Sequence, residues 1–83
     1  MDDAQIRTCA NVVANLLAER GEAPEGYIYA GLMHVGATLD DFNLVKALLI
    51  DLELVTSEPG PVLRPTTKLL RAYERAKLLE RVN

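Results

Sequence analysis

The stretch "TLDDFNLVKALLIDLELV", residues 38–55, contains a helix whose start and inward side are both marked by its residues. Thr38 and Asp41 are spaced as in a capping box, in which a hydroxyl and a carboxylate bond to amides that the first helical turn leaves unpaired. Apolar residues then recur at steps of three and four, which places them on one side of a helix. These inward residues are Phe42, Val45, Leu48, Leu49 and Leu52. We therefore predict a helix that is buried on one side and ends at about Glu53, before a short strand.

The opposite side of this predicted helix carries few positive charges. Lys46 is its only base, and Asp40 and Asp41 stand in its first turn. Acids there are favoured by the helix dipole, so these two aspartates have a purely structural explanation. The predicted outward strip consists of Asp40, Asn43, Lys46, Ala47 and Ile50, with Leu44 at its edge. Contact with a DNA base edge and contact with another protein both remain open for this strip.

Two helices are predicted before this one. Residues 3–20 place Ile6, Cys9, Ala10, Val13, Leu16 and Leu17 on one side of a helix that Asp2 or Asp3 caps and Gly21 ends. Pro24 suits the first position of a second helix, because its missing N–H would be unpaired there. This second helix is expected to run to about Val35, with Ile28, Leu32 and Val35 inward.

A β-hairpin and a last helix are predicted after residue 53. Strand-like residues at 54–57 and 62–64 flank "EPGP", residues 58–61, in which Pro followed by Gly is typical of a type II turn. Pro65 is expected to stop the second strand, and Thr66 or Thr67 to cap a helix over about 66–82. Its predicted apolar face consists of Leu69, Ala72, Tyr73, Ala76 and Leu79, and the apolar residues outside that face are Leu70, Leu78 and Val82.

The order helix, helix, turn, helix, hairpin, helix defines a mainly α fold with a small β-hairpin (α+β), in one domain spanning residues 1–83. The series "YIYAGLM", "TLDDFNLVKALL", "LELV" and "VLRPT", within residues 27–66, resembles the winged helix-turn-helix superfamily. This resemblance implies that the helix-turn-helix lies at about 24–53, the wing at about 54–64, and the third helix in the major groove of DNA. It also implies a dimer formed by the terminal helices. Two departures from the pattern are Glu53, where many members have glycine, and the acidic, proline-rich wing turn.

DNA binding is the first functional hypothesis, with the protein acting as a small dimeric transcription regulator. The candidates for contact with bases are Thr38, Asp40, Asn43 and Lys46, and those for contact with the DNA backbone are Arg64, Lys68, Arg71 and Arg75. Binding to phosphates needs a basic surface. Residues 1–63 hold three bases and ten acids, a net charge of −7, whereas residues 64–83 have a net charge of +4. The acidic segment that contains the third helix therefore counts against this hypothesis.

The second functional hypothesis is a winged-helix module that binds another protein without binding DNA. Its candidate docking residues are Leu44, Ala47 and Ile50 on the third helix. A homodimer is expected in either case, because a last helix with apolar groups on two sides gains stability by burying Leu70, Leu78 and Val82 in a second subunit.

Enzymes, metal sites and cofactor sites are not expected. The sequence has no nucleophile, base and acid set with plausible spacing and no phosphate-binding glycine loop. One cysteine and one histidine make a disulfide impossible within the chain and a transition-metal site improbable. Apolar runs of three or four residues are far short of the roughly 20 needed to cross a bilayer, and the acidic start differs from a signal peptide. A cytoplasmic protein is expected.

Overall fold

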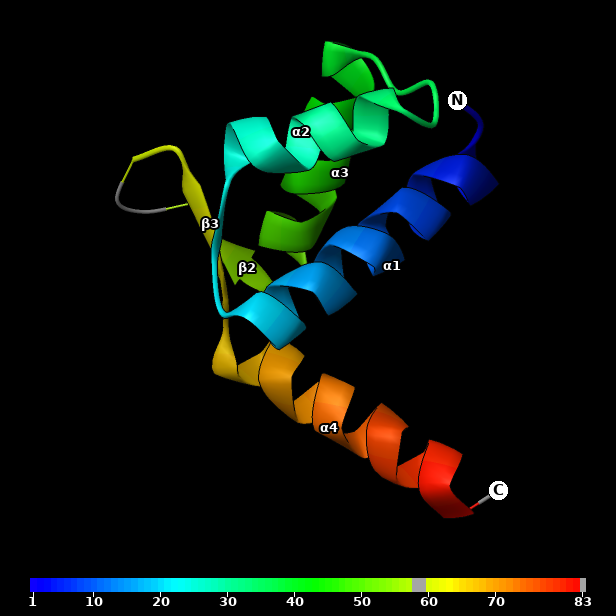
Figure 1. The fold of residues 1–83 in the computed structure, drawn as a ribbon, viewed down its shortest axis with the longest axis vertical. Helices are drawn as coiled ribbons and strands as arrows, with labels where there is room; N and C mark the ends of the chain where they lie inside the picture. Colours follow the sequence, from blue (N-terminus) through cyan, green and yellow to red (C-terminus); the bar gives the residue numbers. More distant parts are fainter. Residues whose placement is uncertain (58–59, 83) are drawn as a thin grey trace.

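The computed structural model describes residues 1–57 and 60–82, with the side chains of all these residues except Val82. This described part is mainly helical with a small antiparallel sheet (Figure 1). Its helices are α1 (Asp3–Arg20), α2 (Glu25–Met33), α3 (Leu39–Asp51) and α4 (Thr67–Val82), and its strands are β1 (Ala23–Pro24), β2 (Val55–Thr56) and β3 (Val62–Pro65). This α+β order is compatible with a winged helix.

Local capping interactions define where α1 and α3 begin. Asp2 caps α1, because its Oδ1 accepts a hydrogen bond of 2.8 Å from the N–H of Gln5. The predicted capping box of α3 is confirmed: the N–H of Asp41 donates to Thr38 Oγ1 at 3.2 Å, and the N–H of Thr38 donates to Asp41 Oδ2 at 2.8 Å. The end of α1 is also as predicted, with Gly21 at φ 92°.

The sheet contains one strand that the sequence did not indicate. Strand β3 lies between β1 and β2, and both neighbours run antiparallel to it. Pro24 has extended backbone angles and pairs with Val62 of β3, so the prediction that it begins the second helix is wrong. Pro65 is the last residue of β3, opposite Val55. Residues 58–59 of the predicted type II turn lie outside the described residues, but Gly60 has φ 72°, which the third position of such a turn requires.

The core lies where α1, α2, α3 and the sheet meet. Its buried residues are Cys9, Ala10, Val13, Ala14 and Leu17 of α1, Ile28 and Leu32 of α2, Phe42, Val45 and Leu49 of α3, Leu69 of α4, and Ala23, Ala37, Val55 and Leu63. The prediction that Cys9 packs in the core is confirmed. Two residues predicted to point inward are exposed instead, Val35 because α2 already ends at Met33, and Leu52 because it follows the end of α3.

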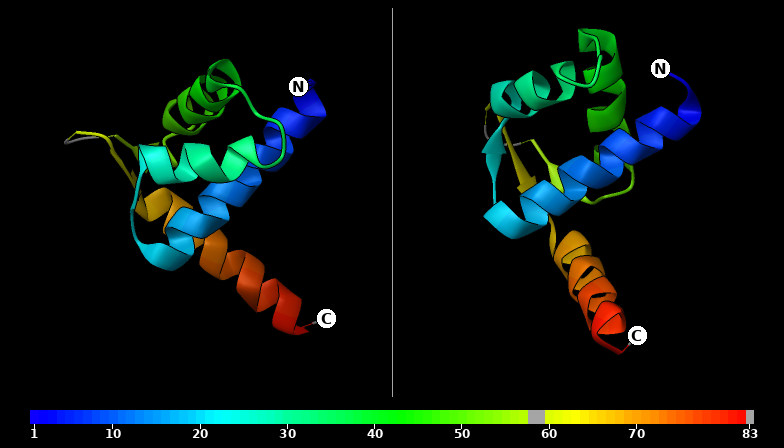
Figure 2. Two further views of the ribbon diagram at one scale, coloured as in Figure 1. Left: turned by 45° about the horizontal axis from the view of Figure 1, so that its top comes forward. Right: turned by 45° about the vertical axis from the view of Figure 1, so that its right-hand side comes forward.

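Within the described part of the chain, the first turns of α4 attach this helix to the rest of the protein. Leu69 is buried and Tyr73 is half-buried, with its hydroxyl 3.1 Å from Glu19 Oε1 on α1. The later residues of the predicted apolar face, Ala76 and Leu79, are exposed, because α4 leads away from the other helices in every view (Figures 1 and 2). The expectation of a continuous buried face is therefore wrong, because Ala72 in the second turn is already exposed.

Candidate interaction surface

An exposed row of side chains runs along the outward side of α3. Residues three or four positions apart share a side of a helix, so Asp40, Leu44, Ala47 and Asp51 line up with an acid at each end. All four are exposed, and Leu44 is 58% exposed. Asn43 and Ile50 lie beside the row and are also exposed. We call this surface the α3 face: Asp40, Asn43, Leu44, Ala47, Ile50 and Asp51.

Lys46, the only base in α3, does not belong to the α3 face. Its Nζ lies 2.8 Å from Glu25 Oε1, in the first turn of α2, and the two side chains are 29% and 20% exposed. The expectation that Lys46 belongs to the outward strip is therefore wrong: its side chain lies along α2, where the carboxylate of Glu25 neutralises it. Since α3 is described over its full length, its outward side has apolar groups and acids but no cation.

Thr38, another residue predicted to contact DNA bases, has a structural role at the start of α3. The hydroxyl of Thr38 caps the helix, so this group is already hydrogen-bonded. Hydrogen bonds from the Thr38 backbone, and then from its side chain, lower the pKa of the Asp41 carboxyl, and the nearby amino group of Met1, 3.9 Å from Asp41 Oδ1, acts in the same direction. The Asp41 carboxyl at this end of the helix therefore stays ionised to a lower pH than an ordinary aspartate.

Just after the end of α3, the backbone adopts a conformation that is unusual for a residue other than glycine. Glu53 has φ 61°, in the left-handed region that favours glycine. The hydroxyl of Thr66, just before α4, hydrogen-bonds to this backbone: its Oγ1 lies 2.7 Å from the Glu53 carbonyl oxygen and 3.1 Å from that of Leu54. The ammonium of Lys68 donates to the Leu52 carbonyl oxygen at 2.9 Å. Lys68, a candidate for DNA backbone contact, thus neutralises the negative end of the helix dipole.

A groove continues the α3 face toward the wing. It has a volume of about 510 Å³ and is lined by Ile50, Glu53, Val55, Thr56, Ser57 and Thr66. Arg64 of β3, the candidate for backbone contact in the wing, places its guanidinium Nη2 3.3 Å from Glu22 Oε2. The apolar surface of α3 therefore extends to the sheet, while the nearby cations Lys46, Arg64 and Lys68 are bonded to protein oxygens.

The remaining basic candidates and the candidate dimer residues lie on α4. Arg71 and Arg75 are exposed and line one side of the helix together with Lys68. Since α4 leads away from α2 and α3 (Figure 1), its later turns lie toward the opposite end of the molecule, whereas Lys68 in its first turn bonds to the end of α3. The fold therefore separates the predicted phosphate contacts instead of gathering all of them around the α3 face. Leu70 and Leu78 are 38% and 59% exposed. The side chain of Val82 lies outside the described residues.

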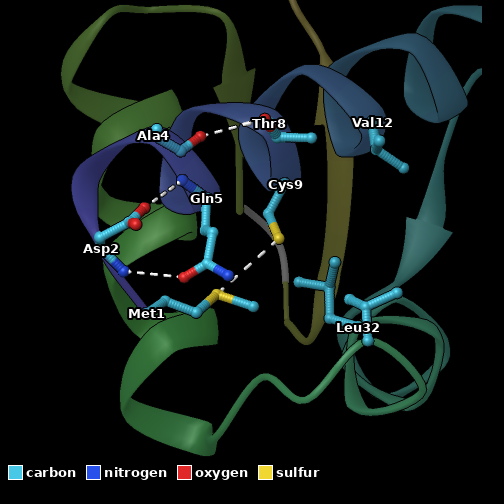
Figure 3. Close-up of a pocket in the computed structure, with 9 residues that line it drawn as sticks. Met1, Asp2, Ala4, Gln5, Thr8, Cys9, Val12 and Leu32 are labelled. Carbon is cyan, nitrogen blue, oxygen red and sulfur yellow. Dashed lines mark hydrogen bonds between the residues drawn. The ribbon is translucent and has the colours of Figure 1, made fainter.

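An apolar cavity that the sequence did not indicate lies between α1 and α2. It has a volume of about 380 Å³, and Met1, Cys9, Val12, Leu32 and Val35 supply most of its apolar lining (Figure 3). Cys9 Sγ lies 3.9 Å from Met1 Sδ across the cavity. Val12 and Val35, which line it, are both exposed, and the sequence signal that could have revealed it is the position of Val12 at the edge of the apolar side of α1. The cavity could hold an apolar group, but its lining residues do not include a catalytic set of acid, base and nucleophile.

Neither a metal site nor a membrane-crossing segment emerges from residues 1–57 and 60–82. His, Cys, Asp and Glu side chains form no group of three or more there that is suited to holding a metal ion, and no helix in this part is both long and apolar enough to cross a bilayer. No protein-family model matches the chain, and comparisons with curated proteins and with solved structures find no similar protein.

Proposed function

We propose that this protein is a winged-helix interaction module that binds another protein through the α3 face, rather than duplex DNA. The order of helices and strands supports the winged-helix assignment. In this proposal α3 occupies the position of a DNA recognition helix but presents an apolar centre between two carboxylates. The matching partner surface has apolar side chains flanked by Lys or Arg.

The pairing of Lys46 with Glu25 carries this proposal. It removes the only cation of α3 from the outward side and leaves Leu44, Ala47 and Ile50 exposed beside Asp40 and Asp51. Covering Leu44 or Ile50 with a partner would contribute about 1–2 kcal/mol each, since both are partly exposed. An exposed apolar strip on a small protein is typical of an interaction site.

DNA binding is the competing hypothesis, and it retains some support. Asn43 and Asp40 are exposed on α3, and such side chains can bind adenine and cytosine in the major groove. However, affinity for DNA comes largely from neutralised phosphates. Lys46, Arg64 and Lys68 are already bonded to Glu25, Glu22 and the Leu52 carbonyl. Binding a phosphate would require breaking these contacts beside several carboxylates, which is why we favour a protein partner.

Titration of the full chain against a fluorescent mixed-sequence DNA duplex distinguishes the two hypotheses. Phosphate contacts are strongest at low salt, so we expect no saturable binding even at about 50 mM salt. Saturable binding that weakens steeply with added salt would contradict the proposal. Loss of a sequence preference on changing Asn43 to Ala would then assign α3 to the DNA groove.

Selection from a displayed peptide library tests the α3 face directly. We expect enrichment of peptides that combine apolar and basic residues, and loss of their binding in Ile50→Glu. The matched control is Met33→Glu, which places the same charge at an exposed apolar residue of α2 and should leave binding unchanged. Equal binding by the Ile50→Glu and wild-type proteins would exclude the α3 face.

A further inference from the structure

One side of α4, from its second turn onward, carries an exposed ridge in which basic and apolar residues adjoin. At about 100° per residue, Arg71, Arg75, Leu78 and Leu79 fall within an arc of about 100°. All four are exposed, and Leu78 and Leu79 are 59% and 60% exposed. The two acids of α4, Glu74 and Glu80, lie outside this arc. We call these four residues the α4 ridge.

The α4 ridge lacks a partner within its own chain among the described residues. Leu69 and Tyr73 attach the start of α4 to the body, and the helix then leads away from it (Figures 1 and 2). Arg71 and Arg75 are like charges four residues apart, an arrangement that is mildly destabilising in a helix and that Glu74, three residues from Arg71, offsets only in part. The ridge therefore combines exposed leucines with a positive charge that an acidic surface would stabilise.

The α3 face has the complementary charge, and Asp51 within it and Glu53 just beyond it are both unfavourable for the stability of the fold. Asp51 lies in the last turn of α3, where a carboxylate is repelled by the helix dipole. The adjacent Glu53 holds a positive φ that glycine would adopt with less strain. Residues that weaken a local structure are expected where binding requires them. Both acids border the apolar strip of the α3 face.

We propose that the α4 ridge of a second copy of this chain docks antiparallel on the α3 face, and that two such contacts form a reciprocal dimer. This inference rests on the proposed protein-binding role of the α3 face and names the partner. Four residues separate Arg75 from Leu79 on α4 and Ala47 from Asp51 on α3, a rise of about 6 Å in each helix. In an antiparallel arrangement Leu79 therefore covers Ala47 while Arg75 meets Asp51.

Charge also favours this contact over pairing of two α4 helices. Helix α4 has five bases, Lys68, Arg71, Arg75, Lys77 and Arg81, against two acids, so two copies of it repel each other. The segment from residue 1 to 63 has a net charge of −7. Opposite potentials on two surfaces set both the partner and its orientation.

The proposal is tested by exchanging the charges of Asp51 and Arg75 between copies of the full chain. Light scattering and sedimentation then measure the mass of each variant in solution. We expect a dimer for the wild type and a dissociation constant raised about tenfold or more by Asp51→Arg or Arg75→Asp, since each variant places like charges together. Mixing the two single variants should restore dimers, because one contact is then wild type and the other has both charges exchanged. The double variant should also form dimers. Leu79→Asp should be monomeric.

Asp3→Arg is the matched control, because it makes the same change of charge at an exposed acid on α1 and should leave the dimer intact. Circular dichroism checks that every variant keeps its helices. A monomeric wild type, or mixed variants that do not associate, would overturn the inference. A monomer that still selects peptides through Ile50 would leave the proposed function standing, whereas binding of duplex DNA would remove that function instead.

Discussion

At the start of α3, Thr38 and Asp41 form a reciprocal cap beside favourably placed acids, whereas at its end an acid opposes the helix dipole and a glutamate occupies a glycine-like conformation. The first end satisfies its own backbone groups. The second depends on distant residues, Thr66 and Lys68, for its hydrogen bonds. This difference indicates that the start of α3 is optimised for stability, while its end combines stability with another requirement, which we propose to be binding.

The largest effect is expected from removing the hydroxyl that supports the end of α3. Thr66 Oγ1 contacts the carbonyl oxygens of Glu53 and Leu54 and accepts from the N–H of Leu69 at 3.3 Å. Thr66→Val should lower the free energy of unfolding by about 2 kcal/mol, the combined effect of a lost helix cap and a lost hydrogen bond. Urea denaturation measures this change. Thr67→Val is the control, and an equal loss in that variant would contradict the role of Thr66.

A smaller loss is expected at the start of the helix. Thr38→Ala removes the acceptor for the Asp41 N–H and should lower the free energy of unfolding by about 1 kcal/mol. Thr38→Ser keeps the hydroxyl and should retain nearly all of the stability in the same denaturation experiment. If the serine variant were as unstable as the alanine variant, the capping role would be wrong.

The contrast between the ends of α3 also explains which features the sequence could predict. Caps at Asp2 and Thr38, the glycine stop at Gly21 and the buried side of α3 depend on residues a few positions apart, so their patterns are visible in the sequence. Pro24 satisfied the local rules for a helix start, but its pairing with Val62 of β3, which lies far along the chain, made it part of a strand. A local pattern cannot reveal such a contact.

The candidate site was less predictable for the same reason. Asp40, Asn43, Leu44, Ala47 and Ile50 were placed on the outward side by helical periodicity alone, and all are exposed. The position of Lys46 depends on Glu25, 21 residues away. The departure of α4 from the body depends on the direction in which β3 ends. Charge pairing across helices and the course of a terminal helix are therefore what changed the functional interpretation.

Replacing the glutamate at the end of α3 should stabilise the protein. A side chain at φ 61° is strained, and glycine relieves the strain at some cost in chain entropy, so Glu53→Gly should raise the free energy of unfolding by somewhat less than about 1 kcal/mol. Glu53→Ala, which loses the charge but keeps the strain, is the control. A glycine variant no more stable than the alanine variant would show that the conformation costs little.

The two acids of the α3 face should respond in opposite directions to neutralisation. Asp51→Asn removes an unfavourable charge at the helix end and should stabilise the fold by about 0.5 kcal/mol, whereas Asp40→Asn should destabilise it by about the same amount. Both effects should diminish at high salt, because exposed charges are screened. Denaturation at low and high salt measures them. The same sign for both variants would remove the argument that Asp51 is retained for binding.

The smallest effect on stability is expected from protonating the carboxyl of Asp41, which belongs to the cap of α3. Hydrogen bonds from the backbone and side chain of Thr38 lower the pKa of this carboxyl in the folded protein. Its stabilisation is therefore fully present above the ordinary aspartate pKa of about 4, and is lost as the pH falls through the lowered value. The stability difference between wild type and Asp41→Ala should accordingly be constant near neutral pH and shrink in acid. Asp41→Asn cannot titrate, so its difference from Asp41→Ala should not change with pH. A difference between wild type and Asp41→Ala that stays constant down to acid pH would show that the charge of Asp41 adds nothing to the cap.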